Sequence, residues 1–456
     1  MEKNNSQSEK LGTMPIGKLL ASMSIPAIFS MLVQSLYNVV DSIFVSRIGE
    51  DALTAVSLAF PLQMLIIAFA LGVGVGVNSL IARKLGEGDR EAASKTASTG
   101  FFLAIINALV FMLLGLFASH FFMKLFSQNE AIIDMGTSYL SIVLVFSFGI
   151  FIETNCSRTL QATGNMIIPM FSQLIGAITN IILDPIMIFG LLGFPAMGIK
   201  GAAIATVIGQ IFSMIFVLIM FRIKSHDVHL QIRGFKLEKS YIIDIYKVGL
   251  PTIIMNAIGS LTTTFLNGIL ISFSSTAVAI FGIYFKLQSF IFMPVFGLVQ
   301  GSMPIMGYNY GANNKKRFMQ TLKLALLTSF TIMLIGTCIF WIFPAQLLAL
   351  FDGSPEMIKM GVYVLRVISL CFIPAAFGIT LSTMFQSIGH GFKSLLMSLL
   401  RQLVLIIPSA WFFATNIGLD AVWFCYPLAE ITCALIFMPL AAIVVKKAFA
   451  AKALEV

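Results

Sequence analysis

The chain alternates between apolar runs long enough to cross a lipid bilayer and short polar or glycine-rich connections. A transmembrane helix needs about 20 residues to cross a hydrocarbon core of about 30 Å. The runs that meet this requirement cover residues 18–46, 53–82, 94–122, 131–157, 166–191, 199–222, 243–272, 277–307, 319–346, 356–386, 393–414 and 420–445. The pattern predicts an all-α membrane protein with twelve transmembrane helices.

Several residues of the first half of the chain recur in the second half. Each recurs at the same separation, or offset, which is that between Pro26 and Pro251, and no gap is needed. The matched pairs are Pro26 and Pro251, Gly72 and Gly297, Gly76 and Gly301, Gly86 and Gly311, Phe126 and Phe351, Gly136 and Gly361, Gln161 and Gln386, Gly164 and Gly389, and Gly193 and Gly418. Because this offset contains six predicted helices, an even number, both halves have the same orientation in the membrane. We expect two pseudo-symmetric six-helix bundles around a central cleft.

The composition leaves no room for a soluble domain. Of 456 residues, 58% are hydrophobic and 11% are charged, whereas soluble proteins have about 45–50% apolar and 25% charged residues. This excludes an appended ATPase domain, a nucleic-acid-binding module and a large receptor head. The predicted divisions are a cytoplasmic tail (1–17), an N-terminal lobe (18–222), a cytoplasmic linker (223–242), a C-terminal lobe (243–446) and a second tail (447–456).

The distribution of positive charge predicts the orientation. The chain has 29 Lys and Arg against 20 Asp and Glu, a net charge of +9. With the amino terminus inside, twenty-two of these basic residues fall on inside segments and only four on outside loops, as expected for cytoplasmic loops. Both termini are therefore predicted to be cytoplasmic, and the polar amino terminus is interpreted as a tail, not a signal peptide.

Four acidic residues fall within predicted spans: Asp41, Glu153, Asp184 and Glu430. An ionisable group in a bilayer costs several kcal/mol unless it is paired or hydrated, so each is a functional candidate. Two of them belong to polar stripes, because spacings of three, four and seven residues return to one helix face. The first stripe holds Gln34, Tyr37, Asn38 and Asp41, and the second holds Gln173, Asn180 and Asp184.

Asp41 and Asp184 are the predicted ion-coupling groups, together with Asn180. At 1.5 Å per residue, both acids lie about 9–12 Å inside the external ends of their helices, so they can share one pocket. The repeat places Leu266 and Ser409 at the corresponding positions of the second bundle. An architectural role would recur in both halves, so the asymmetry favours an H⁺ site, or a Na⁺ site, near Asp41 and Asp184.

Other intramembrane polar residues have less clear partners. Glu153 is open to two interpretations, a local ion pair with Arg158 or a role in the cavity. Arg401 and Glu430 lie at similar depth on neighbouring helices, and we interpret them as a structural ion pair. Lys286 and Arg366 have no clear partner. A further polar stripe on the seventh helix is expected to line the cleft: Asn256, Ser260, Thr263 and Asn267.

Catalytic chemistry has no support in the sequence. No GxxxxGK[ST], HExxH or GxSxG motif occurs, and the five cysteines form no CxxC pair. Gly72/Gly76 and Gly297/Gly301 form GxxxG motifs, which let helix backbones approach closely. We therefore expect no enzyme activity, no cofactor and no bound metal other than a possible Na⁺.

The chain resembles the MATE family of multidrug and toxin extrusion transporters along nearly its whole length. The resemblance is carried by the segments SIPAIFSMLVQSLYNVVDSIFVSRIGEDALTAVSL, GVGVGVNSLIARKLGEGDREAA, RTLQATGN, NIILDPIMIFG, GIKGAAIATVIGQ, GYNYGANNKKR and GLDAVWFCYPLAE. It implies a two-lobed exporter that alternates between inward-open and outward-open states, driven by H⁺ or Na⁺. In the DinF-like bacterial branch, the coupling aspartate of the first helix corresponds to Asp41, and an asparagine and an aspartate of the fifth correspond to Asn180 and Asp184. The seventh-helix acid of the family's other bacterial branch is missing between Pro251 and Phe273.

Two functional hypotheses follow. The first is a multidrug antiporter in a bacterial inner membrane that exports small amphipathic, often cationic, organic compounds. The 42 Phe and 25 Met residues suit adaptable apolar cavities. The alternative is a flippase for a lipid-linked precursor, or an exporter of one metabolite. Under either hypothesis we expect a monomer in the lipid bilayer, without ATP or nucleic acid as a partner.

Overall fold

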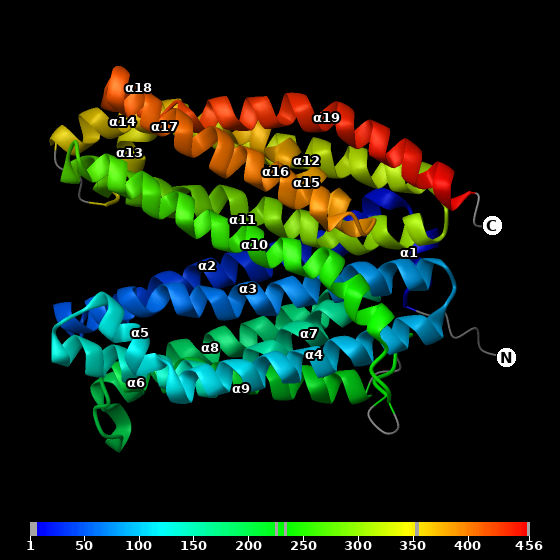
Figure 1. Ribbon diagram of the computed structural model, residues 1–456, viewed down its shortest axis with the longest axis horizontal. Helices are drawn as coiled ribbons and strands as arrows, with labels where there is room; N and C mark the ends of the chain where they lie inside the picture. Colours follow the sequence, from blue (N-terminus) through cyan, green and yellow to red (C-terminus); the bar gives the residue numbers. More distant parts are fainter. Residues whose placement is uncertain (1–6, 224–226, 232–234, 352–354, 454–456) are drawn as a thin grey trace.

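Long helices make up most of the chain in the computed structural model, which describes residues 7–223, 227–231, 235–351 and 355–453 (Figure 1). The first half holds α1 (Glu9–Thr13), α2 (Ile16–Ser46), α3 (Glu50–Gly86), α4 (Arg90–Phe117), α5 (Ser119–Phe126), α6 (Glu130–Val145), α7 (Phe148–Ala162), α8 (Ile167–Phe189) and α9 (Ile199–Ile223). The second half holds α10 (Lys239–Ile271), α11 (Ser275–Gly311), α12 (Lys315–Ile342), α13 (Pro344–Ala349), α14 (Pro355–Ser369), α15 (Phe372–Ser387), α16 (Gly391–Leu399), α17 (Ile407–Asn416), α18 (Leu419–Val422) and α19 (Cys425–Lys452). A 3₁₀ turn covers Leu191–Gly193, and a π-helical segment covers Leu400–Ile406.

The helices confirm the predicted all-α membrane fold. Within the described residues, ten helices are long and apolar enough to cross a bilayer, and two bent pairs bring the total to as many as twelve. The pair α6 and α7 bends by 43°, and the pair α14 and α15 bends by 44°. The sequence pattern predicts unbroken helices over 131–157 and 356–386, so the breaks near residues 146 and 371 correct it. These two breaks are separated by the same offset as Pro26 and Pro251, in agreement with the repeat.

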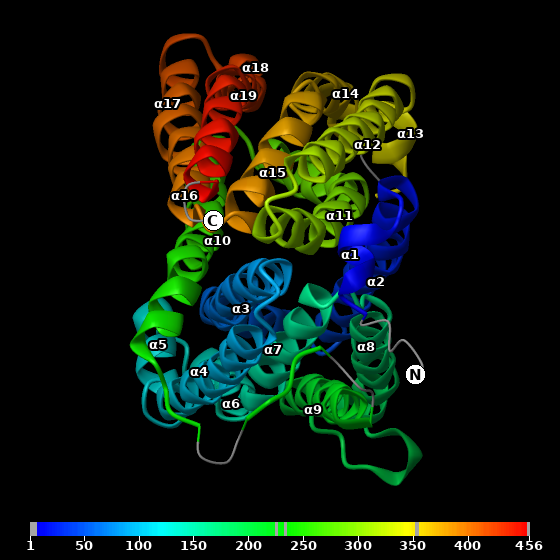
Figure 2. The same cartoon turned by 90° about the vertical axis from the view of Figure 1, so that its right-hand side faces the viewer.

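The helices form two lobes that lie side by side. The N lobe contains α2–α9 and the C lobe contains α10–α19, and both chain termini lie at the same end of the molecule, here called the terminus end (Figures 1 and 2). Within the N lobe, α8 packs against α9 and α2, and α7 packs between α3 and α9. Between the lobes, α3 packs against α10, and α2 packs against α11.

Glycines of the two GxxxG motifs bring the lobes together. A Cβ atom on Gly72 would lie 2.8 Å from the carbonyl oxygen of Gly249, and one on Gly297 would lie 2.5 Å from Cα of Ile28. Gly86 and Gly311 approach the opposite lobe equally closely, at the carbonyl oxygens of Tyr308 and Arg83. All these contacts fall in the halves of the helices nearer the terminus end, and α3 and α10 diverge toward the other end (Figure 1). The lobes are therefore closed together at the terminus end.

A short helix that the sequence pattern assigns to a tail lies between the lobes at this end. Leu11 of α1 is fully buried, and its carbonyl oxygen accepts hydrogen bonds from Asn309 and Arg317 of the C lobe. On the other side, the amide of Ser8 donates to Asp227 of the linker at 2.7 Å, and a Cβ on Gly164 of the N lobe would lie 3.4 Å from a methyl carbon of Leu11. The tail predicted at residues 1–17 thus includes a segment that joins both lobes.

The glycine interface predicts a large effect of one methyl group. We expect Gly301→Ala to lower the free energy of unfolding by about 1–3 kcal/mol, because the new Cβ would meet the backbone nitrogen of Ser24 at 2.8 Å and overpack the interface. Gly282→Ala on the same helix is the matched control, since a Cβ there meets no atom within 4 Å. Thermal unfolding of both variants in detergent measures the difference. Equal stability of the two variants would contradict the proposed tight contact.

Candidate functional site

Two carboxyl groups meet inside the N lobe, from helices that are distant in the sequence. Asp41 on α2 and Asp184 on α8 share a hydrogen bond between their side chains. Asp184 is fully buried, whereas Asp41 is partly exposed. Two ionised carboxylates this close would repel each other, so we expect the pair to hold one proton between its two acids.

Asn180 and Thr206 support the acidic pair from one side. With its amide oriented to satisfy both ends, Asn180 donates from Nδ2 to Oδ2 of Asp184 at 2.8 Å and accepts from the Thr206 hydroxyl at 3.2 Å. Asn180 lies one helical turn before Asp184 on α8, which places both on the face toward α9. Asn180 is 2% exposed and Thr206 is 6% exposed, so this support is shielded from solvent.

Two tyrosines complete the surroundings of the pair. Tyr37 lies one turn before Asp41 on α2, and its hydroxyl hydrogen-bonds to Thr206. Tyr139 of α6 lies close enough to interact electrostatically with both acids, and its hydroxyl contacts Gln63 of α3 at 3.5 Å. Five helices therefore contribute to the site, and hydroxyl and amide groups surround the carboxyl groups.

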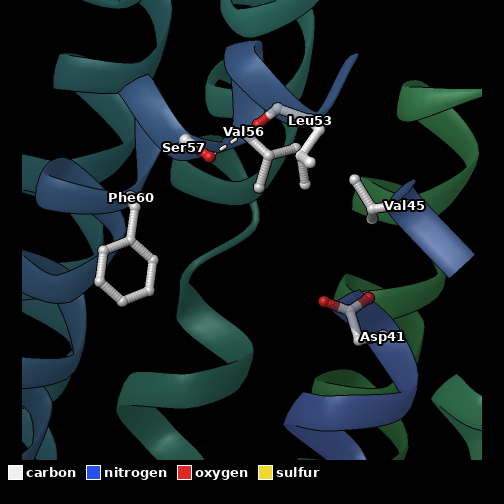
Figure 3. A pocket seen from close by; sticks show the side chains of 6 residues that line it. All are labelled: Asp41, Val45, Leu53, Val56, Ser57 and Phe60. Atoms are coloured by element: carbon white, nitrogen blue, oxygen red, sulfur yellow. Dashed lines mark hydrogen bonds between the residues drawn. The ribbon is translucent and has the colours of Figure 1, made fainter. Parts of the chain in front are cut away.

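A pocket adjoins the partly exposed acid. Its volume is about 260 Å³, and it lies between α2 and α3. The Asp41 carboxyl group borders this pocket together with apolar side chains and one hydroxyl, as Figure 3 shows. The lining residues are Asp41, Val45, Leu53, Val56, Ser57 and Phe60. An ion that enters the pocket can reach Asp41 before it reaches Asp184.

The other residues of the two predicted N-lobe stripes lie in different surroundings. Gln34 and Asn38 are exposed on α2. Gln173 lies on α8 with its side-chain oxygen buried and without a hydrogen-bond donor among the described residues. The structure therefore places Tyr37 and Asp41 in the site, and the assignment of Gln34, Asn38 and Gln173 to the cavity stays a prediction.

Among the residues that the structure describes, the predicted stripe on α10 makes no hydrogen bond or ion pair with the acidic pair. Asn256 donates to the carbonyl oxygen of Thr252, and Thr263 donates to that of Gly259, both within their own helix. Ser260 is exposed and Asn267 is partly buried. These side chains form a polar strip on the C lobe, separate from the acids of the N lobe.

Glu153 contacts serines and forms no salt bridge with Arg158 within the described part of the chain. Its Oε1 atom accepts hydrogen bonds from Ser157 at 2.6 Å and from Ser172 of α8 at 3.0 Å. The guanidinium group of Arg158 instead donates to Gln161 at 3.2 Å. These contacts take the place of the ion pair of the first interpretation, and a role of Glu153 in the cavity stays a prediction.

In the C lobe, Arg401 Nη1 lies 3.1 Å from Glu430 Oε1. Glu430 is 7% exposed, and its second oxygen is buried without a donor among the described residues. Arg401 lies in the π-helical segment Leu400–Ile406.

The ammonium group of Lys286 lies 5.9 Å from the centre of the Phe351 ring, and Arg366 donates to the carbonyl oxygen of Trp341.

Sequence reasoning missed Thr206, Tyr139 and Gln63. Tyr139 and Gln63 have no polar neighbour three, four or seven residues away on their helices. Thr206, in contrast, begins a polar spacing with Gln210 and Ser213 that could have pointed to it. Their contribution depends on how the helices meet. No group of three or more His, Cys, Asp or Glu side chains in the described chain is arranged to hold a metal ion.

Comparisons with known proteins agree with the repeat and with the fold. The MatE family model matches residues 26–186 and again residues 251–412. The multidrug export protein MepA of Staphylococcus saprophyticus is 25% identical over 422 residues, which cover 92% of each chain. MepA of Staphylococcus aureus is 26% identical over 425 residues, 93% of each chain.

Solved structures extend the similarity to the whole architecture. An outward-facing multidrug resistance MATE family transporter of the MOP superfamily superposes with a TM-score of 0.91 and 28% identity, covering 96% of this chain and 98% of that one. A MOP superfamily transporter from Pyrococcus furiosus gives a TM-score of 0.90 with the same identity and coverage. With the two matches to the family model, these findings show that the chain belongs to the MatE family of membrane transporters.

Proposed function

We propose that the chain exports amphipathic, often cationic, organic compounds by antiport with H⁺ or Na⁺. The observation that carries the proposal is the hydrogen-bonded pair of Asp41 and Asp184 beside an open pocket. Such a pair can bind and release one cation, because its charge changes by one unit between the protonated and ionised forms. For Na⁺, the oxygen atoms of Asp41, Asp184 and Thr206 are the hard ligands that such an ion prefers.

The closed terminus end supports a cycle of alternating access. If both termini are cytoplasmic, as the distribution of Lys and Arg predicts, the lobes are closed toward the cytoplasm and the pocket at Asp41 belongs to an outward-facing state. Binding of the ion to the acidic pair would then favour the inward-facing state, because the ion binds more tightly to that state than to the outward-facing one. Release of the ion inside would allow a substrate to bind and be carried out.

The substrate class is supported by a second pocket and by the relatives. A pocket of about 580 Å³ lies between α10 and α17, within the range of about 300–1,000 Å³ that drug-sized ligands occupy. Its lining combines aromatic rings with hydroxyl groups, a surface suited to amphipathic molecules. The aromatic residues are Phe265, Phe273 and Trp411, and the hydroxyl residues are Thr264, Ser272 and Thr415. The staphylococcal relatives are named as multidrug export proteins.

Transport in everted membrane vesicles tests this proposal, because export then appears as uptake of a cationic dye into the lumen. We expect an acidic lumen or a Na⁺-loaded lumen to accelerate dye uptake, since the coupling ion moves out as the dye moves in. Separate gradients identify the ion, and an ionophore that collapses each gradient is the control. Dye uptake that responds to neither gradient would refute the antiport mechanism.

A further inference from the structure

We propose that protons cross the N lobe along a file of polar side chains that runs between α8 and α9 from Asp41 and Asp184 to Glu153, which is a second proton-carrying station. This inference rests on the proposed antiport and specifies H⁺ as the ion and a route inside one lobe. It assigns Glu153 a function that its position near Arg158 does not explain.

The first part of the file begins at the acidic pair. Asp184 and Asn180 are four residues apart on α8, and Asn180 contacts the Thr206 hydroxyl of α9 at 3.2 Å. From Thr206, the same face of α9 continues to Gln210 and Ser213, four and seven residues further along. The polar groups thus continue from the acidic pair toward the terminus end.

The last part of the file ends at Glu153. Ser172 lies on α8, twelve residues before Asp184, which corresponds to about 18 Å along the helix. Its hydroxyl lies 3.0 Å from Glu153 Oε1 and 3.1 Å from the carbonyl oxygen of Ser213, and the Ser213 hydroxyl donates back to the Ser172 carbonyl oxygen. These serines connect Glu153 on α7 with both α8 and α9.

Between these two parts, the protein leaves acceptors without donors. The side-chain oxygens of Gln173 and Gln210 are buried, with no hydrogen-bond donor in the described chain. A buried acceptor costs free energy unless a partner is present, and an internal water molecule is the usual partner. Water that donates to Gln173 and Gln210 would join the two parts into one path for protons.

The proton balance of the path is simple. A proton leaves the carboxyl group of the acidic pair, which becomes ionised, and passes through water to the Glu153 carboxylate, which becomes a neutral acid. Glu153 then releases the proton toward the terminus end when that side opens. The charged group that acts on Glu153 is Arg158 of its own helix, while α8 presents the neutral hydroxyl of Ser172 to it.

The C lobe has the same fold, but at the corresponding positions it has neither the carboxyl group of Glu153 nor the small uncharged residue Gly176. At the offset of the repeat, Gly378 takes the place of Glu153, and Arg401 takes the place of Gly176, which lies between Gln173 and Asn180. A fixed guanidinium cation at that point repels a proton in transit. In the N lobe, Gly176 instead allows α8 to approach α9, where its Cβ would meet the Ser213 hydroxyl at 2.6 Å.

The test compares Glu153→Gln, Glu153→Asp and Gln173→Leu in liposomes. We expect Glu153→Gln to reduce dye transport driven by a pH gradient by at least about tenfold, with dye affinity unchanged, and Glu153→Asp to restore part of the rate. Gln173→Leu removes a buried acceptor that no group of the described chain satisfies, so it should keep thermal stability close to normal, yet it should slow the same transport. A purely structural role for Gln173 predicts unchanged transport, so this variant remains informative even if Glu153→Gln folds poorly.

Two outcomes would overturn the inference. Normal pH-driven transport by Glu153→Gln would exclude Glu153 as a station, and a loss of dye affinity equal to the loss of transport would make it a substrate contact. Asp41→Asn, measured in the same liposomes, separates these outcomes from failure of the antiport proposal. If Asp41→Asn is inactive while Glu153→Gln is normal, the antiport proposal stands and the file does not.

Discussion

Asp41→Asn is expected to reduce ion-driven dye export by at least about tenfold, while expression and membrane insertion stay normal. The substitution preserves the size of the side chain and its ability to hydrogen-bond to Asp184, and it removes the group that exchanges a proton. Dye binding to the purified variant should persist, because the defect lies in coupling. Gradient-driven transport in vesicles and dye binding in detergent measure the two properties separately.

The matched control for this variant is Asp134→Asn, the same chemical change at an exposed position on α6. It should transport at the normal rate. Asp184→Asn should impair transport as Asp41→Asn does, and the double variant should be no worse than the more damaging single variant, because two acids that share one proton act as one site. Losses that multiply in the double variant would show instead that the two acids have separate functions.

Much of the architecture follows from periodicity in the sequence. The repeat matches Gly72 with Gly297 and Gly76 with Gly301, and the structure uses all four glycines at the interface between the lobes. The helical spacing from Tyr37 to Asp41 and from Asn180 to Asp184 likewise identifies side chains that do converge. These features depend on the position along one helix, which a sequence specifies directly.

Features that depend on contacts between helices were not predictable in this way. Thr206 and Tyr139 reach the acidic pair only because α9 and α6 pack near α8 and α2, and the polar spacing of Thr206 with Gln210 and Ser213 on α9 does not reveal which helix it meets. The short helix α1 is another example, since its burial depends on Asn309 and Arg317, which lie far along the chain in the other lobe. The role of the stripe at Asn256 stays a prediction, because a polar face along one helix does not reveal what it meets.

The Arg401 and Glu430 pair raises the question of whether a buried charge serves structure or transport. Glu430 Oε2 lies 3.5 Å from the position that a Cβ on Gly378 would occupy. Gly378 is the repeat counterpart of Glu153, so both lobes place a carboxyl group in the same internal region, from different helices. In the N lobe that carboxyl group contacts neutral serines, whereas in the C lobe it is held by a guanidinium group. A fixed counter-charge favours a structural role for Glu430.

We therefore expect Arg401→Met to lower the free energy of unfolding by about 3–5 kcal/mol, because it leaves the buried charge of Glu430 uncompensated. Glu430→Leu should cost less, because the Arg401 side chain that it leaves is 27% exposed. The double variant should recover much of that loss and should still export dye, since well-packed apolar residues can replace a buried ion pair at little cost. Thermal unfolding of the single and double variants gives the coupling between the two positions. Strictly additive destabilisation would show that the pair contributes no interaction, and a folded double variant without transport would place Glu430 in an ion pathway of the C lobe.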